Sequence, residues 1–166
     1  MKVLFVCSQN MCRSPYCEMM FRKLVNESEI LKDKVEVTRS SAVMTPGTSI
    51  DPLTVEALVR EGFDKETVEL HCPGYMFRKA DRTLFNDADI IIGMTKSHKY
   101  MIPIRKWRKK FKTLSEVAIG EYKAVPDPWL QRDPEKYVGE MNKIKAYLEK
   151  YIENLEKDLG KEPNFE

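Results

Sequence analysis

The sequence lacks an apolar run of membrane-spanning length, and no charged leader precedes a long apolar segment at its N-terminus. Histidine is scarce as well. The two histidines, His71 and His98, are not accompanied by cysteines or carboxylates at the spacing of zinc ligands. From these absences we expect a cytoplasmic protein with no membrane partner, no metal and no other cofactor.

Cysteine is too infrequent for a disulfide scaffold. Two of the four cysteines, Cys7 and Cys12, lie in one short stretch near the N-terminus. This usage is typical of proteins from a reducing compartment. We expect the other two, Cys17 and Cys72, to be small buried apolar residues.

No stretch of the 166 residues resembles a linker that would divide the chain. A chain of this length can bury a full hydrophobic core, so we expect one domain spanning residues 1–166. The oligomeric state stays open.

Positive charge is concentrated in one segment although the net charge is only +2. Eight Lys or Arg residues and no acid lie between Lys96 and Lys112, interleaved with Trp107 and Phe111. Such a segment can be a docking face for an acidic partner or for nucleic acid, or an ordinary solvated helix face. The solvated face is the commoner case, so we do not expect a nucleic-acid partner.

The N-terminal residues predict a strand, a loop and a helix in close succession. Lys2 to Val6 is short and has no polar alternation within its apolar run, which is typical of a strand buried on both faces. Ser14 followed by Pro15 is a helix-start signal, with the hydroxyl as N-cap. The loop from Cys7 to Ser14 therefore lies where open α/β sheets bind ligands and where helix N–H groups attract anions.

Two residues of this loop predict its chemistry. The planar guanidinium of Arg13 can bind two oxygens of a phosphate. The same positive surroundings stabilise a thiolate at Cys7, placed for in-line attack on phosphorus and a cysteinyl-phosphate intermediate. The alternative interpretation is a buried core cysteine with an arginine beside a helix start.

The remaining chain alternates between predicted strands and helices, which indicates a parallel sheet with helices on both faces. Further strands are predicted at Val35 to Thr38, Asp89 to Met94 and Phe111 to Leu114, with an extension of the last to Val117 left open. The predicted helices are one from Asp51-Pro52 to Gly62, an amphipathic segment from Tyr75 to Phe85, one through the basic segment that Pro103 interrupts or bends, and one from Pro134 to Leu159.

The loop from Cys7 to Pro15 resembles the signature C-x-G-N-x-C-R-S-P of the low-molecular-weight protein tyrosine phosphatases. Asp127-Pro128 resembles a second element of that family. The resemblance implies a single three-layer α/β domain whose four-stranded parallel sheet has flavodoxin-like order. It also implies hydrolysis of phosphotyrosine, an aryl phosphate monoester, in a protein or small-molecule substrate.

The resemblance assigns roles to individual residues. Cys7, Arg13 and Asp127 are the predicted catalytic residues, with Asp127 as the proton donor to the leaving group. Met11 is apolar where arginine phosphatases of similar sequence tend to have threonine, so phosphotyrosine is expected rather than phosphoarginine. The predicted phosphate-binding residues are Ser8, Gln9, Asn10, Met11, Cys12, Arg13, Ser14 and Trp129.

Several of these residues have a more specific expected role. Asn10 is expected to take a positive φ, and Ser14 to donate its hydroxyl to the Cys7 thiolate. Gln9 departs from the glycine of the family, which can change the shape of the loop. Trp129 either stacks on a substrate ring or packs in the core. The resemblance implies that Cys12 is a redox partner, which forms a reversible disulfide with Cys7.

Two other functions fit the same loop. Thioredoxin-coupled arsenate reductases share it, but they use two further cysteines after the third strand, and no cysteine follows Asp89 here. A non-catalytic phosphopeptide-binding module would retain binding without turnover. The presence of Cys7, Arg13 and Asp127 together argues against that module.

Overall fold

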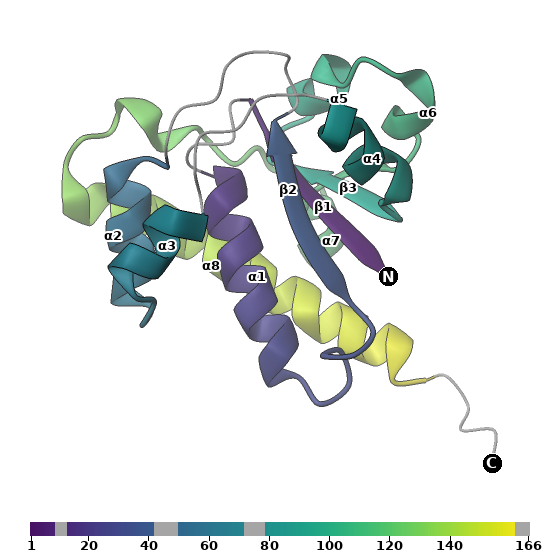
Figure 1. The fold of residues 1–166 in the computed structure, drawn as a ribbon, viewed down its shortest axis with the longest axis horizontal. Helices are drawn as coiled ribbons and strands as arrows, with labels where there is room; N and C mark the ends of the chain where they lie inside the picture. The colour runs from purple at the N-terminus through teal and green to yellow at the C-terminus, as the bar shows by residue number, and fades with distance from the viewer. Residues whose placement is uncertain (9–12, 42–49, 72–78, 162–166) are drawn as a thin grey trace.

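A computed structural model describes residues 1–8, 13–41, 50–71 and 79–161. Four parallel strands form one sheet in the order β2-β1-β3-β4 (Figure 1). Their bounds are β1 (Lys2–Cys7), β2 (Glu36–Ser41), β3 (Ile90–Gly93) and β4 (Phe111–Thr113). The predicted fold class, a four-stranded parallel sheet of flavodoxin-like order with helices on both faces, is confirmed.

Alternate residues of the central strand β1 face two separate cores. Val3 and Phe5 belong to the larger core, and Leu4 and Val6 belong to the smaller one. All four side chains are fully buried. The uninterrupted apolar sequence of β1 thus follows from helices that cover both faces of the sheet.

The larger core lies beneath α1 (Arg13–Glu27), α2 (Pro52–Arg60), α3 (Lys65–His71), α7 (Leu114–Ile119) and α8 (Pro134–Leu159). The smaller core lies beneath α4 (Lys79–Asp87), α5 (Ser97–Met101) and α6 (Arg105–Arg108), on the other side of the sheet (Figure 1). In the smaller core, Trp107 stacks on Phe85 with 4.8 Å between ring centroids. Its indole N–H donates to Asn86.

Several boundaries differ from the sequence-based expectations. The extension of the fourth strand to Val117 is wrong, because Thr113 and Glu116 form a capping box that starts α7. Helix α1 begins at Arg13, one residue before the predicted cap Ser14. The helix from Lys65 to His71 was not predicted, and residues 75–78 of the predicted amphipathic segment lie outside the described ranges.

The basic segment forms two short helices, α5 and α6, on either side of Pro103, and it ends in β4. Part of its charge is structural. Lys110 donates to the carbonyl oxygens of Phe85, Asn86 and Ala88 at the end of α4, and Arg108 donates to the Ile102 carbonyl. Lys110 and Arg108 therefore bind within the protein and do not contribute to a docking face.

The terminal helix α8 carries one apolar stripe of seven residues, and all seven are buried. The stripe consists of Tyr137, Met141, Ile144, Leu148, Tyr151, Ile152 and Leu155. It packs on the larger core of its own domain, where Phe21 of α1 stacks on Tyr151 with 5.3 Å between centroids. No helix in the described ranges is long and apolar enough to cross a membrane.

We expect Leu148→Ala to lower the free energy of unfolding by about 3 kcal/mol, because Leu148 is fully buried and its truncation leaves a cavity. Leu70→Ala is the matched control, since Leu70 is 75% exposed, and it should cost less than about 0.5 kcal/mol. Urea unfolding followed by circular dichroism measures both. Equal losses would contradict the packing of α8 on its own domain.

Candidate active site

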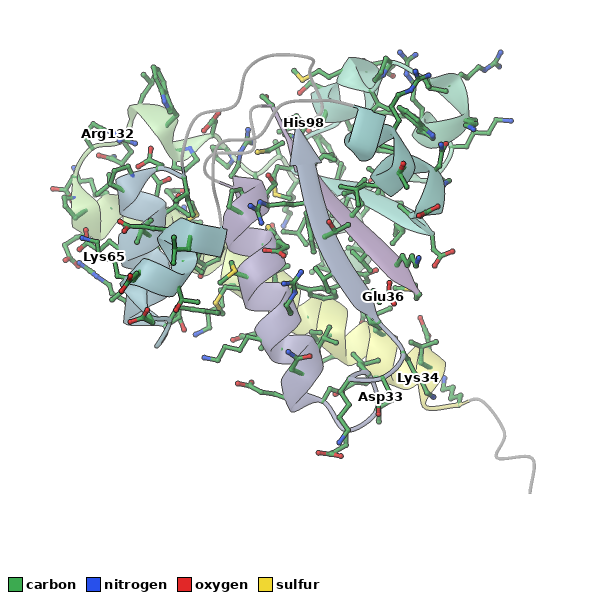
Figure 2. All side chains as sticks on the ribbon, viewed as in Figure 1. Asp33, Lys34, Glu36, Lys65, His98 and Arg132 are labelled. Carbon is green, nitrogen blue, oxygen red and sulfur yellow. The ribbon has the colours of Figure 1, made fainter. Side chains whose placement is uncertain are left out.

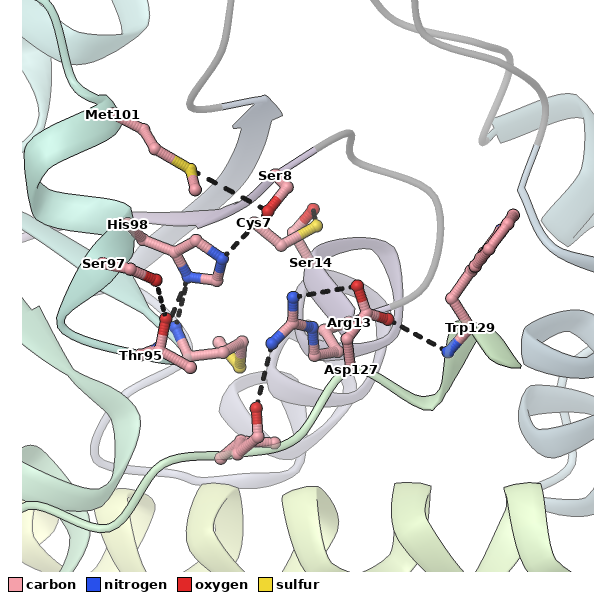
Figure 3. Close-up of polar contacts among 12 residues, drawn as sticks. Cys7, Ser8, Arg13, Ser14, Thr95, Ser97, His98, Met101, Asp127 and Trp129 are labelled. Atoms are coloured by element: carbon pink, nitrogen blue, oxygen red, sulfur yellow. Dashed lines mark hydrogen bonds and ion pairs between the residues drawn. The ribbon is translucent and has the colours of Figure 1, made fainter. Parts of the chain in front are cut away.

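The proposed nucleophile Cys7 is the last residue of β1, and its side chain is buried. Its Sγ lies 3.1 Å from the hydroxyl oxygen of Ser14, which is buried in the first turn of α1 (Figure 3). A hydroxyl at this distance can donate a hydrogen bond to a thiolate. The structure thus places the strand end, the thiol and the helix start together, as the sequence predicted.

The middle of the loop lies outside the described residues. Gln9, Asn10, Met11 and Cys12 belong to this part. The positive φ of Asn10, the effect of Gln9 and the redox role of Cys12 therefore stay predictions. Cys17 is fully buried, as expected, and burial raises the pKa of its thiol, so it is no competing nucleophile.

Arg13 connects the loop to a distant part of the chain. Its buried guanidinium donates to the Val125 carbonyl at 2.9 Å and contacts a carboxylate oxygen of Asp127 at 3.4 Å. The other carboxylate oxygen of Asp127 accepts from the Trp129 N–H at the start of the short helix η1 (Pro128–Leu130). The three predicted catalytic residues therefore belong to one site.

The side chains of Asp127 and Trp129 are both about half exposed. The Asp127 side chain is 50% exposed and Trp129 is 54% exposed. Figure 3 shows the Trp129 ring extending away from the contact between Arg13 and Asp127. Packing of Trp129 in the core, one of the two sequence-based expectations, is therefore wrong. Trp129 stands where it can meet a substrate.

The segment that carries Asp127 is fixed at both ends. At one end, the Val125 N–H donates to the Met94 carbonyl just after β3. At the other end, Arg132 pairs with the buried carboxylate of Asp51 at 2.9 Å, and Asp51 also caps α2. Figure 2 shows Arg132 beside α2 and separated from His98. The backbone around Asp127 is therefore held while its side chain stays accessible.

His98 belongs to this site, although the sequence analysis did not select it as a site residue. The ring is 1% exposed. Its Nδ1 accepts from the N–H groups of Met94 and Thr95 at 3.0 and 3.4 Å, and its Nε2 lies 3.3 Å from the hydroxyl of Ser8 (Figure 3). The available signal was its position, four residues after the end of a predicted strand next to the strand of Cys7.

The buried position of His98 keeps its ring neutral. Burial, and after it the Arg13 guanidinium, lower the pKa of His98 from 6.5 to about 4, against an opposing effect of Asp127. In the unfolded chain the ring binds a proton below about pH 6.5, whereas in the folded protein it does so only below about pH 4. Folding stability therefore falls as the pH drops through this window.

We predict that acidification from pH 7 to pH 4.5 costs the wild type about 2 kcal/mol more unfolding free energy than it costs a His98→Asn variant. The variant has no imidazole to protonate, and its other titratable groups are those of the wild type. Urea unfolding at both pH values measures the difference. An identical loss in the two proteins would show that His98 is not held neutral.

The described residues contain no group of three or more His, Cys, Asp or Glu side chains that could hold a metal ion. The chemistry available at the site is that of a thiol, a guanidinium, a hydroxyl and a carboxylate, carried by Cys7, Arg13, Ser14 and Asp127. This set suits binding of a phosphate dianion, attack by sulfur and proton transfer.

Comparison with known proteins agrees with this geometry. The family model described as low molecular weight phosphotyrosine protein phosphatase matches residues 2–162. The protein-arginine-phosphatase of Bacillus subtilis (strain 168) is 28% identical over 160 residues, covering 95% of this chain and 99% of the relative. The low molecular weight phosphotyrosine protein phosphatase of Sus scrofa is 26% identical over 156 residues, covering 89% and 94%.

A solved structure shows the same fold. The crystal structure of a low molecular weight protein tyrosine phosphatase from T. tengcongensis aligns with a TM-score of 0.75 at 28% identity, covering 93% of this chain and 99% of that one. The family model thus matches nearly the whole chain, including the strand of Cys7, the helix of Arg13 and the segment of Asp127. The chain belongs to the low molecular weight phosphotyrosine protein phosphatase family.

Proposed function

We propose that this protein is a metal-independent phosphatase that hydrolyses phosphotyrosine through a cysteinyl-phosphate intermediate on Cys7. One observation carries the proposal. The thiol of Cys7, at the carboxyl end of β1, contacts Ser14, and Arg13 beside Ser14 contacts the carboxylate of Asp127, although Asp127 is 114 positions from Arg13 in the sequence.

The first chemical step transfers the phosphoryl group to sulfur. The Cys7 thiolate attacks phosphorus while the bond from phosphorus to the phenolic oxygen breaks. Arg13 neutralises charge on the phosphoryl oxygens, and Asp127 gives its proton to the leaving phenolate. The Val125 carbonyl, which accepts from one Arg13 nitrogen, keeps the guanidinium oriented during this step.

The second step restores the enzyme. A water molecule attacks the phosphorus of the cysteinyl-phosphate, Asp127 accepts a proton from that water, and the bond from sulfur to phosphorus breaks. Inorganic phosphate leaves and the thiolate returns. The Ser14 hydroxyl, 3.1 Å from Cys7 Sγ, can stabilise the thiolate as it forms.

Two observations bear on the substrate class. The exposed ring of Trp129, two residues after Asp127, suits contact with the ring of phosphotyrosine. The relative from Bacillus subtilis, in contrast, is named a protein-arginine-phosphatase, which makes phosphoarginine the second candidate. Met11 is apolar in this sequence, and on that ground we place phosphotyrosine first.

We expect Cys7→Ser to abolish hydrolysis of para-nitrophenyl phosphate, because the nucleophile is lost. Asp127→Asn should lower kcat by about 10²- to 10⁴-fold, because the proton donor is lost. Asp133→Asn is the matched control and should match the wild type, since Asp133 caps α8 and asparagine caps equally well. The assays run from pH 5 to 8 with EDTA and a thiol reductant.

Different outcomes of these assays would favour the other functions. No turnover by reduced, folded wild type would contradict the phosphatase. If that inactive protein still bound a phosphopeptide, it would be a binding module, and if it reduced arsenate with thioredoxin, it would be an arsenate reductase. Loss of activity in EDTA would contradict a metal-independent mechanism.

We further predict that Trp129→Ala lowers kcat/KM for a phosphotyrosine peptide by about three- to tenfold, because a ring contact is lost. Trp129→Phe keeps an aromatic ring and should lose less. The same peptide carrying phosphoarginine should be a poorer substrate of the wild type. A higher kcat/KM for phosphoarginine, unaffected by Trp129→Ala, would assign the protein to the second candidate.

A further inference from the structure

We propose that His98 is a positioning residue of the phosphate-binding loop, which holds Ser8, the residue directly after the nucleophile, against the end of β3 by a hydrogen bond. The inference rests on the proposed function, because it assigns His98 a part in the same site. It adds to the site a second attachment, independent of the contact between Cys7 and Ser14.

The direction of this hydrogen bond follows from the partners of the ring. Nδ1 faces two backbone N–H donors, those of Met94 and Thr95, so Nδ1 must be the unprotonated acceptor. A neutral ring then carries its proton on Nε2, which donates to the Ser8 oxygen at 3.3 Å. The Ser8 hydroxyl in turn points to the Met101 sulfur at 3.9 Å. Each donor in this chain of hydrogen bonds therefore faces an acceptor, from the backbone N–H groups through His98 and Ser8 to Met101.

The bond joins the carboxyl ends of two neighbouring strands. Ser8 follows β1, and His98 lies on α5 just after β3. The two strands pair in register, with Phe5 opposite Ile92. The two backbone N–H donors hold the buried ring from the β3 side. Through its bond to the ring, Ser8 is therefore fixed relative to the sheet. A surface contact would not fix Ser8 in this way.

This attachment matters for the nucleophile. Cys7 lies between two fixed points, Ser8 on the side of His98 and Ser14 on the side of α1. A displacement of Ser8 would rotate the backbone that carries the thiol, and small misplacements of a reacting group cost rate. Because His98 is neutral, it supplies a donor to the loop without adding charge beside Arg13.

A buried histidine with a purely structural role is the competing explanation, and one substitution separates the two. In His98→Asn, the side-chain oxygen takes the place of Nδ1 and still accepts from Met94 and Thr95. The shorter side chain has nothing in the place of Nε2, so the bond to Ser8 is lost. Ser8→Ala removes the same bond from the other side and leaves His98 intact.

The test measures kcat and KM for para-nitrophenyl phosphate and Ki for inorganic phosphate at pH 6.5, in wild type, His98→Asn, Ser8→Ala and the double variant. We expect each single substitution to raise KM and Ki by about five- to tenfold, with a smaller change in kcat. The double variant should show the same five- to tenfold change, because both substitutions remove the same hydrogen bond between His98 and Ser8. Melting temperatures at this pH should stay close together.

Two kinetic outcomes would overturn the inference. If the single effects multiply in the double variant, His98 does not act through Ser8. If KM and Ki stay at wild-type values while the melting temperature of His98→Asn falls, the histidine is only structural. A wild type without turnover refutes the proposed function, and the inference is then decided by the binding of inorganic phosphate.

Phosphate binding is read from protection of Cys7 against alkylation by iodoacetamide, followed by mass spectrometry of the Cys7 peptide. We expect about five- to tenfold more phosphate to be needed for half protection in His98→Asn and in Ser8→Ala than in wild type. Equal requirements in the three proteins would overturn the role of His98. No protection in wild type would overturn both proposals.

Discussion

The buried guanidinium of Arg13 is the constraint on which the site depends. A charge removed from water is stable only if polar partners surround it, and the Val125 carbonyl and the Asp127 carboxylate supply two of them. These partners lie more than a hundred residues further along the chain, so the need to satisfy Arg13 brings the loop after β1 and the segment of Asp127 together. The contact with Asp127 is long, at 3.4 Å, and half-exposed, so a phosphate group can replace it at modest cost.

The sheet explains why this constraint can be met. In a parallel sheet all carboxyl ends lie at one edge, and here β1 ends in Cys7 while its neighbour β3 leads to Met94 and His98. Met94 accepts from Val125 through its carbonyl and donates to His98 through its N–H. Met94, the residue directly after β3, therefore orients both the segment of Asp127 and the His98 ring that contacts Ser8.

The sequence predicted the parts of the site that carry a local pattern. The strand that ends at Cys7, the helix start around Ser14 and the Asp-Pro pair each have a recognisable signal, and the structure places all three at one edge. His98 has no such signal, because its role depends on the neighbouring strand, and a single histidine in a basic segment has no periodicity or partner in the sequence.

Two features of the fold that the sequence-based predictions missed do have a signal in the sequence. Thr113-x-x-Glu116 is a capping box that rules out a longer fourth strand, and Asp64 accepts from Thr67 at the start of the unpredicted helix α3.

The charge of Arg13 also limits what its neighbours can be. A second buried cation beside it would be repelled and would have to lose its proton, and this effect lowers the pKa of His98 in addition to burial. A donor on the β3 side of the loop therefore has to be neutral, which a histidine with two N–H groups facing Nδ1 achieves. A lysine there would add a charge that competes with Arg13 for the substrate. With a neutral donor on that side, the positive charge at the proposed phosphate position comes from Arg13, whose planar fork matches a phosphate.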